Sequence, residues 1–474
     1  MDLEKLYLAL PIPLQNLGVT ATGWRIRRRR FDREFRQLWA AYDERTGWDR
    51  LRVSRLRDRR LAEFVQRAAR DVPHYRELFE RLRIDPREIG GLEELSVLPV
   101  LTKEEVQRAP ERFRSPAIGR RRLLAAHTSG STGAGLRFVT TWSAHREQWA
   151  VWWRYRGWHG LRPGTACLYM GGRSIVPVRQ RRPPYWRRNH AGSQTLFSAY
   201  HLNSDTAGDY LREMRDSGAP WIHGYPSMVA LLASFSLEFG IRVPVRWVTL
   251  GAENLLPSQA RVIERAFGVE PIEHYGMAEA VANVSMCPER RLHVDEDFAA
   301  TEFVPDDAGR LRVVGTNFTN PAFPLIRYEV GDHATLDEVE CGCGRPGRTV
   351  ARLDGRLEDY VVTKSGALLG RLDHIFKDLE RVREAQIRQS EPGRIVVAVV
   401  RGPGWGEPDE RRLRGEILKR VGDQLDFDIV YPDSLGRTAR EKLRFVISTM
   451  ERGKLAAPVG RTPDATARTD EESR

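Results

Sequence analysis

The chain has 474 residues, of which 41% are hydrophobic and 30% are charged, and its formal net charge is +12. This composition is ordinary for a soluble globular protein, and the length predicts more than one domain and a large core. No run reaches the roughly 20 apolar residues that a membrane-spanning helix needs, so we expect no membrane span.

The N-terminal segment Leu6–Leu14 is apolar, but acidic residues precede it, Pro11 and Pro13 interrupt it, and no small-residue cleavage site follows it. We therefore expect no signal peptide. Four cysteines are too few for a disulfide framework, which favours a cytoplasmic location.

The positive charge is spread along the chain, with dense arginine runs at Arg25–Arg30 and near Arg181–Arg188. Solvated basic faces account for this distribution more simply than a nucleic-acid surface, which needs a basic face with stacking aromatic rings. We expect no nucleic-acid partner.

Apolar residues recur at helical spacing between residues 24 and 70, which predicts amphipathic helices that end at Pro73. Thr102 followed by Glu105 is the pattern of a helix N-cap with a capping box. From about residue 120 to 350, short β-rich runs alternate with helical ones, which predicts an α/β fold with a largely parallel sheet. The expected strands are Ala166–Met170 and Trp247–Leu250, and the expected helices are Ala144–Tyr155, Ser227–Phe239 and Pro257–Phe267.

A second unit is expected from about Gly355, with strands at Ile395–Val400 and Asp428–Tyr431 and a helix at Asp409–Val421. These elements predict a small α+β domain. The predicted organisation is a large N-terminal domain (1–354, with a helical lead-in at 1–118), a small C-terminal domain (355–453) and a disordered tail (454–474).

A glycine-rich loop is expected between two short strands near residue 130. It reads His127, Thr128, Ser129, Gly130, Ser131, Thr132 and Gly133. Two glycines let a ligand approach the backbone, the hydroxyl groups add donors, and consecutive amides in such a turn form an anion site. The Gly-Lys-Ser/Thr ending of a Walker loop is missing, so the loop predicts a phosphate site of another kind.

Five further patches follow this loop: Gly251–Glu253, His274–Glu279, Ile326–Asp332, Leu353–Asp359 and Arg437–Arg444. With these patches in this order, the chain resembles the adenylate-forming superfamily, which includes acyl-CoA synthetases, peptide-synthetase adenylation domains and luciferases. Within it, the chain is most similar to the phenylacetate–CoA ligase-like branch, which includes proteins of capsular polysaccharide biosynthesis. The resemblance covers roughly residues 60–450. It implies a large α/β domain and a small mobile C-terminal α+β domain.

The resemblance implies that residues Thr128–Gly133 hold the β- and γ-phosphates of ATP, with His127 beside them. Glu279 would help to bind Mg²⁺, a hard cation that prefers oxygen ligands. Lys442, on the small domain, would swing in and neutralise charge on the carboxylate and the α-phosphate during adenylation.

The resemblance also implies a nucleotide pocket. Tyr275 and Gly276 would lie against the nucleotide, with Ala252 and Glu253 near adenine. The ribose hydroxyls would donate hydrogen bonds to Asp332. The remaining implied contact is from Arg356 to ribose or phosphate.

The sequence departs from many relatives at two points. The phosphate loop lacks a closing lysine, and Arg137 is the cation that follows it. Glu441 stands before Lys442 where many relatives have glycine, and a neighbouring carboxylate raises the pKa of a lysine or competes for its charge. The hinge between the domains is expected at Gly355–Asp359, with Glu358 at the pivot.

Three thiols and one imidazole form a separate pattern. They are Cys287, His293, Cys341 and Cys343. Three sulfur ligands and one nitrogen ligand suit a closed tetrahedral Zn²⁺ site with a structural role. Four unrelated loop residues are the competing interpretation. Cys167, inside an apolar run, is expected in the core.

The preferred hypothesis is an AMP-forming ligase that activates a small carboxylic acid, in one version an aryl acid, and passes the acyl group to coenzyme A or to the phosphopantetheine of an acyl carrier protein. Transfer of the acyl group to an amine, or of AMP to a hydroxyl, stays open. A non-catalytic nucleotide-binding or polyanion-binding scaffold is the hypothesis from another class. Monomer and homodimer both stay open.

Overall fold

The computed structural model describes most of the chain. The described residues are 3–128, 135–171, 175–177, 179–253, 255, 257–306, 309–337, 339–354, 361–366, 368–369, 372–376, 379, 381–401, 404–433, 435 and 446–448. Among them, no helix combines the length and the apolar composition that crossing a membrane requires.

The first part of the chain is helical. Its helices are α1 (Leu3–Ala9), α2 (Ile12–Arg30), α3 (Arg33–Glu44), α4 (Arg50–Asp71), α5 (Pro73–Leu82) and α6 (Lys103–Arg108). The hydroxyl of Thr102 accepts a hydrogen bond from the backbone N–H of Glu105 (3.2 Å), which confirms the predicted N-cap of α6. The expectation that the helical stretch ends at Pro73 was wrong. Pro73 is the first residue of α5, a position where its fixed φ and missing N–H are tolerated.

A short antiparallel hairpin, β1 (Leu123–His127) and β2 (Arg137–Thr141), follows the helices and precedes α7 (Trp142–Trp158). Next comes a twelve-stranded sheet with the order β11-β12-β13-β14-β10-β9-β8-β7-β6-β3-β5-β4. Its strands are β3 (Cys167–Gly171), β4 (Trp186–Asn189), β5 (Gln194–Ser198), β6 (Trp221–Gly224), β7 (Trp247–Gly251), β8 (Pro271–Gly276), β9 (Asn283–Met286), β10 (Leu292–Val294), β11 (Ala300–Pro305), β12 (Leu311–Thr316), β13 (Tyr328–Leu336) and β14 (Thr349–Asp354).

Only the middle of this sheet is parallel, which corrects the expectation of a largely parallel sheet. Strands β5, β3, β6, β7 and β8 run parallel, and every pair from β8 to β11 is antiparallel, as is β4 with β5. Helical crossovers α8 (Ala207–Ser217), α9 (Pro226–Phe239) and α10 (Pro257–Phe267) separate the later parallel strands. From β8 to β13 each connection is shorter than the dozen or more residues that a parallel crossover needs.

The C-terminal part forms a smaller α/β unit with its own core. Its elements are β15 (Val361–Val362), β16 (Leu368–Leu369), β17 (Val382–Glu391), β18 (Arg394–Arg401), α11 (Glu407–Val421), β19 (Asp426–Val430) and β20 (Val446–Ser448). Four strands form a sheet in the order β19-β18-β17-β20, and α11 contributes Leu413 and Ile417 to the apolar cluster of this unit. The expected strands and helix of the second unit are confirmed.

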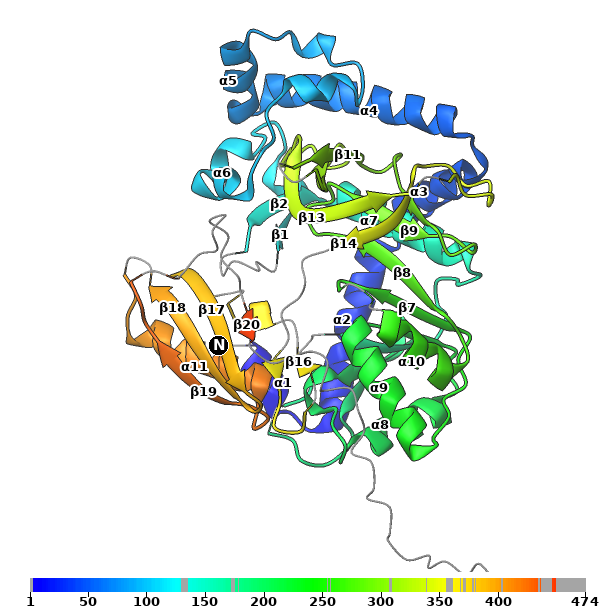
Figure 1. The fold of residues 1–474 in the computed structure, drawn as a ribbon, viewed down its shortest axis with the longest axis vertical. Coiled ribbons are helices and arrows are strands. Elements are labelled where there is room, and N and C mark those ends of the chain that lie inside the picture. The colour runs from blue at the N-terminus through cyan, green and yellow to red at the C-terminus, as the bar shows by residue number, and fades with distance from the viewer. Residues whose placement is uncertain are drawn as a thin grey trace, which may run out of the picture.

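The two units lie side by side, with the small sheet next to the lower part of the large one (Figure 1). They touch where the end of α11 meets residue 200. The side-chain amide of Gln424 donates a hydrogen bond to the backbone oxygen of Tyr200 (2.9 Å), and Arg420 donates to its hydroxyl.

Candidate functional site

The phosphate-loop prediction falls between β1 and β2. The backbone N–H of Thr128 donates to the oxygen of Leu136, and the hydroxyl of Thr128 accepts from the N–H of Leu136, both at 2.9 Å. These two bonds close the base of the loop. His127 is exposed at the end of β1 and pairs in register with Arg137. Residues 129–134 lie outside the described residues.

The carboxyl ends of β7 and β8 lie side by side, because Gly251 pairs in register with His274. Ala252 follows β7 with φ at +68°, a left-handed conformation that costs a non-glycine residue strain and that clusters at functional sites. Gly276 ends β8 where a Cβ atom would lie 2.8 Å from the Oδ1 atom of Asn283. Ligands in open α/β sheets bind at such strand ends.

Two predicted nucleotide residues meet directly. The hydroxyl of Tyr275, at the end of β8, donates a 2.7 Å hydrogen bond to the Oδ2 atom of Asp332. Asp332 lies in β13, where the register against β12 shifts between Arg312 and Val314. Gly331 has φ at +85° in this bulge. Bulges redirect side chains, and here one aims the carboxylate at the end of β8.

The predicted magnesium ligand Glu279 lies in the segment after β8. The side-chain amide of Asn317 donates to the backbone oxygen of Glu279 (3.1 Å), and that of Asn320 donates to the oxygen of Val139 in β2 (3.0 Å). The loop after β12, which carries both asparagines, thus joins the β1–β2 hairpin to the segment that carries Glu279. Sequence reasoning missed both asparagines, because loop asparagines commonly satisfy turns without any functional meaning.

A ring-lined region lies between α7 and the middle of the sheet. His274 stacks on Tyr155 with ring centroids 4.8 Å apart, and its Nε2 lies 3.0 Å from the Oδ1 atom of Asn283. Burial, and then the charge of Arg156, lower the pKa of His274 and of His223 to about 3, so both rings are neutral at pH 7. Arg156 is 5% exposed and was missed, because arginine is abundant throughout this chain.

The remaining predicted residues of the nucleotide site lie outside the described residues. They are Ser129, Gly130, Ser131, Thr132, Gly133, Arg356 and Lys442, with the hinge 355–359 and Glu441. The tail after residue 453 lies outside them as well. The described site residues are Thr128, Ala252, Glu253, Tyr275, Gly276, Glu279 and Asp332; among them, Tyr275 and Asp332 are hydrogen-bonded, and Ala252 follows the strand next to β8.

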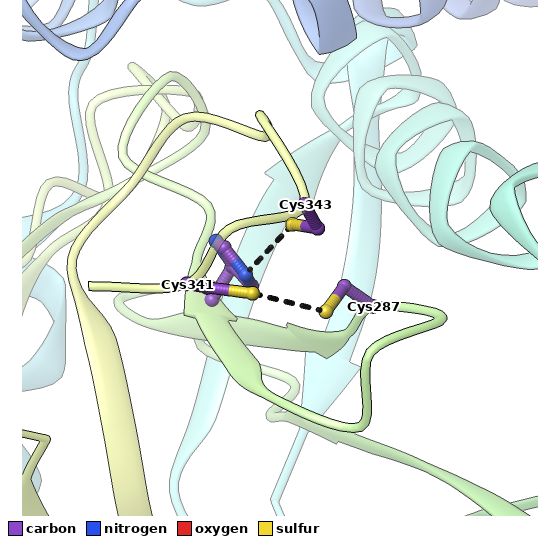
Figure 2. Close-up of side chains that lie close together, drawn as sticks. Cys287, Cys341 and Cys343 are labelled. Carbon is purple, nitrogen blue, oxygen red and sulfur yellow. Dashed lines mark hydrogen bonds between the residues drawn. The ribbon is translucent and has the colours of Figure 1, made fainter. Parts of the chain in front are cut away.

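The three thiols and the imidazole come together near the end of β9 and the start of β14. Cys287 follows β9, His293 lies in β10, and the other two cysteines precede β14. The Sγ atoms of Cys287 and Cys341 are 3.7 Å apart, and the Sγ atom of Cys343 is 3.4 Å from the Nε2 atom of His293. Their ligand atoms all lie within 4.8 Å of one another. Figure 2 shows the three thiols turned toward a common point. Ligands about 2.3 Å from a tetrahedral zinc ion lie roughly 3.8 Å apart, so the cluster has the size of a zinc site.

The surroundings of His293 suit a metal ligand. Its Nδ1 atom lies 3.3 Å from the oxygen of Pro346, an arrangement that leaves the Nε2 lone pair for a metal. Burial lowers the pKa of His293, which favours the neutral ring that coordinates. Cys167, by contrast, lies in the core at 2% exposure, and burial raises the pKa of its thiol, as expected of a structural cysteine.

The fold is that of adenylate-forming enzymes. A crystal structure of a 2-hydroxyisobutyryl-CoA ligase, in complex with 2-HIB-AMP and CoA, is similar with a TM-score of 0.56 at 18% sequence identity. The match covers 85% of this chain and 91% of that one.

The sequence comparisons show which proteins with this fold the chain is similar to. Residues 361–449 match the family described as CapK C-terminal domain. Protein CapK of Staphylococcus aureus is 23% identical over 460 residues, covering 95% of this chain and all of that protein. A phenylacetate-coenzyme A ligase of Thermus thermophilus is 26% identical over 445 residues, covering 84% and 97%. Over most of its length the chain is thus similar to CapK and to a phenylacetate-coenzyme A ligase, and its fold is shared with adenylate-forming enzymes.

Proposed function

We propose that this protein is an AMP-forming acid–thiol ligase. In the first step a carboxylate oxygen attacks the α-phosphorus of ATP, the bond between the α- and β-phosphates breaks, and pyrophosphate leaves. In the second step the thiol sulfur of coenzyme A attacks the acyl carbon of acyl-AMP, and AMP leaves with the bonding electrons while the thiol loses its proton. A phenylacetate-coenzyme A ligase that matches 84% of this chain supports this proposal.

The observation that carries the proposal is the hydrogen bond between Tyr275 and Asp332 at the end of β8. It fixes the position of the carboxylate, to which the two ribose hydroxyls would donate hydrogen bonds. Ala252 and Glu253, at the neighbouring strand end, would contact adenine. The strained φ of Ala252 turns the backbone at that point.

The phosphates would lie against the loop that Thr128 and Leu136 close. Amides and hydroxyls of Thr128–Gly133 would stabilise charge on the departing pyrophosphate. Glu279 would supply a carboxylate oxygen to Mg²⁺, which when bound neutralises phosphate charge. We assign Lys442 the neutralisation of charge at the reacting carboxylate, with Arg356 at the ribose or phosphate and His127 beside the loop.

The thiol cluster is proposed to hold one structural Zn²⁺. With Cys287, His293, Cys341 and Cys343 as ligands, the site is closed and offers no position to a substrate. We also propose a cytoplasmic location, which suits reduced thiols and the use of ATP and coenzyme A as substrates.

Exchange of labelled pyrophosphate into ATP tests the first step, using a panel of aryl and short acyl acids. We expect exchange with at least one acid and, after addition of coenzyme A, release of AMP with thioester formation. Exchange without thioester formation would indicate that the acceptor is a carrier protein, an amine or a hydroxyl instead of coenzyme A. Tight ATP binding without exchange for any acid in a broad panel would favour the scaffold instead.

A further inference from the structure

Helix α2 exposes an apolar stripe to solvent. Leu14 is 46% exposed, Leu17 is 64% exposed and Trp24 is 56% exposed. Ala21 is exposed between them. Spacings of three, four and three residues place these side chains on one face of a helix. Leu6 of the preceding helix α1 adds a further side chain that is 45% exposed.

The opposite face of α2 is bonded to the protein through polar groups. The side-chain amide of Gln15 donates to the oxygen of Leu10 (2.9 Å), and its oxygen accepts from the guanidinium of Arg187. The side-chain oxygen of Asn16 accepts from the backbone N–H of Arg188 (2.9 Å), and the hydroxyl of Thr20 donates to the Arg188 oxygen (3.2 Å).

Gly23 lies where a Cβ atom would clash with Asn189, so β4 and the turn after it hold this face closely. Surface helices normally turn their apolar face inward. Helix α2 follows that pattern only in part: Val19 packs against an apolar cluster, and Gln15 and Asn16 bond to β4, but two leucines and a tryptophan are left in water. Exposed apolar groups arranged in this way mark an interaction surface.

The same helix is strongly basic. Its 19 residues include Arg25, Arg27, Arg28, Arg29 and Arg30 and no acidic residue. Arg28 continues the apolar stripe and stacks over the ring of Trp24 at 5.3 Å, and Arg25 flanks it. A helix with leucine and tryptophan on one face and arginines around it fits the boundary between lipid headgroups and acyl chains.

We propose that α2 docks the protein on an anionic lipid surface. Leu14, Leu17 and Trp24 enter the headgroup region, and Arg25 and Arg28 contact lipid phosphates. The helix lies in the plane of the membrane and does not cross it. This inference is independent of the proposed ligase reaction and supplies a use for the arginine run that the nucleotide site does not need.

A second copy of the chain fits this surface less well. Two such helices would bring the Arg25 and Arg28 side chains of both copies toward each other without acidic partners on α2. The exposed stripe is also one side chain wide, whereas a stable interface buries roughly 800 Å² on each partner. Charge complementarity therefore favours lipid over self-association.

Co-flotation of the full-length protein with vesicles tests the proposal. The protein should bind vesicles of phosphatidylglycerol and phosphatidylcholine, bind phosphatidylcholine alone weakly, and lose binding as salt rises. Leu17→Glu combined with Trp24→Glu should lower the bound fraction on the order of tenfold. Arg25→Glu combined with Arg28→Glu should do the same for anionic vesicles only.

Leu51→Glu is the matched control, since Leu51 is 59% exposed on α4, in another part of the molecule (Figure 1). It should bind vesicles as the unchanged chain does. Thermal unfolding and pyrophosphate exchange of each variant show that the fold and the proposed nucleotide site are intact. Absence of binding to anionic vesicles overturns the proposal. So does a dimer in sedimentation that Leu17→Glu dissociates, since the stripe would then be a contact between two copies.

Discussion

Asp332 owes its position to one glycine. Gly331 adopts φ at +85°, a conformation that a residue with a Cβ atom rarely takes, and the bulge it allows points the next carboxylate toward β8. The hydroxyl of Tyr275 meets that carboxylate at 2.7 Å. The two side chains are 57 residues apart in sequence, and β14, β10 and β9 separate their strands in the sheet order, so only the three-dimensional course of the chain brings them together.

Tyr275→Phe tests the pair with little change in shape. Loss of a hydrogen bond to a charged acceptor costs about 1.5 to 3 kcal/mol. We expect KM for ATP to rise on the order of tenfold, with a larger rise for Asp332→Ala. Steady-state pyrophosphate exchange at varied ATP measures both. Tyr431→Phe, in the small unit, is the control and should leave KM for ATP unchanged. An unchanged KM in Asp332→Ala would remove this residue from the nucleotide site.

Helix α7 is anchored to the rest of the large unit by buried charge. Arg154 is 2% exposed and bonds Asp295 (2.6 Å) and Asp297 (2.8 Å), and Arg45 of the segment after α3 reaches Asp297 at 3.3 Å. Burial raises the pKa of Asp295. Burial also opposes ionisation of Asp297, but the charges of Arg154 and then Arg45 outweigh it and hold its pKa below the usual value.

Arg154→Leu should therefore be strongly destabilising. It leaves two buried carboxylates without their main partner, a change that costs about 3 to 5 kcal/mol. Urea unfolding measures the loss. Arg212→Leu, in an exposed pair with Asp209, is the control and should change stability by less than about 1 kcal/mol. A small effect of Arg154→Leu would mean that the two carboxylates find other partners or take up protons.

The connection between β13 and β14 is the element that the thiol cluster would organise, because it carries Cys341 and Cys343. Metal analysis should find about one zinc per chain. Cys343→Ser and prolonged chelation should each lower the thermal midpoint, since binding energy at a structural zinc site is folding energy. Cys167→Ser tests a buried thiol outside the cluster and should leave the zinc content unchanged. A protein that contains no zinc as purified, and whose thermal midpoint neither chelation nor Cys343→Ser lowers, contradicts the zinc proposal.

At the scale of the molecule, partly buried histidines couple folding to pH. Burial is the first cause that lowers the pKa of four of them below the ordinary value of 6.5. These pKa values are about 4 for His74 and His145 and about 3 for His223 and His274. The unfolded chain takes up protons near pH 6.5 and the folded chain does so only at lower pH. The stability linked to these groups is therefore complete above pH 6.5 and is lost as the pH falls toward 4.

His74→Gln isolates one such group away from the nucleotide site. Each neutral buried histidine contributes a slope of at most about 1.4 kcal/mol per pH unit between pH 4 and 6.5. The variant should show a smaller fall in the free energy of unfolding over this range, measured in urea at several pH values. His190→Gln, at an exposed position, is the control. Equal slopes in His74→Gln and the unchanged chain would contradict the buried, neutral state of His74.

The sequence by itself determined many of the elements and the fold class. Apolar spacing placed α7, α9, α10 and α11 within a few residues, because their buried faces repeat at the helical period. Turn and hydroxyl residues marked the base of the phosphate loop at Thr128. The ordered patches indicated the adenylate-forming fold. One of them contains Gly276 at the end of β8, where a side chain would clash with Asn283.

Only the tertiary structure decided which of these residues meet. Local periodicity describes a strand and its faces but not its partners, so it missed the antiparallel strands from β9 to β14. The same limit hid the Tyr275–Asp332 bond, the asparagine links to Glu279 and the charges around Arg154. The outward face of α2 was hidden too, since sequence gives the apolar stripe of a helix but not the side that the rest of the protein covers.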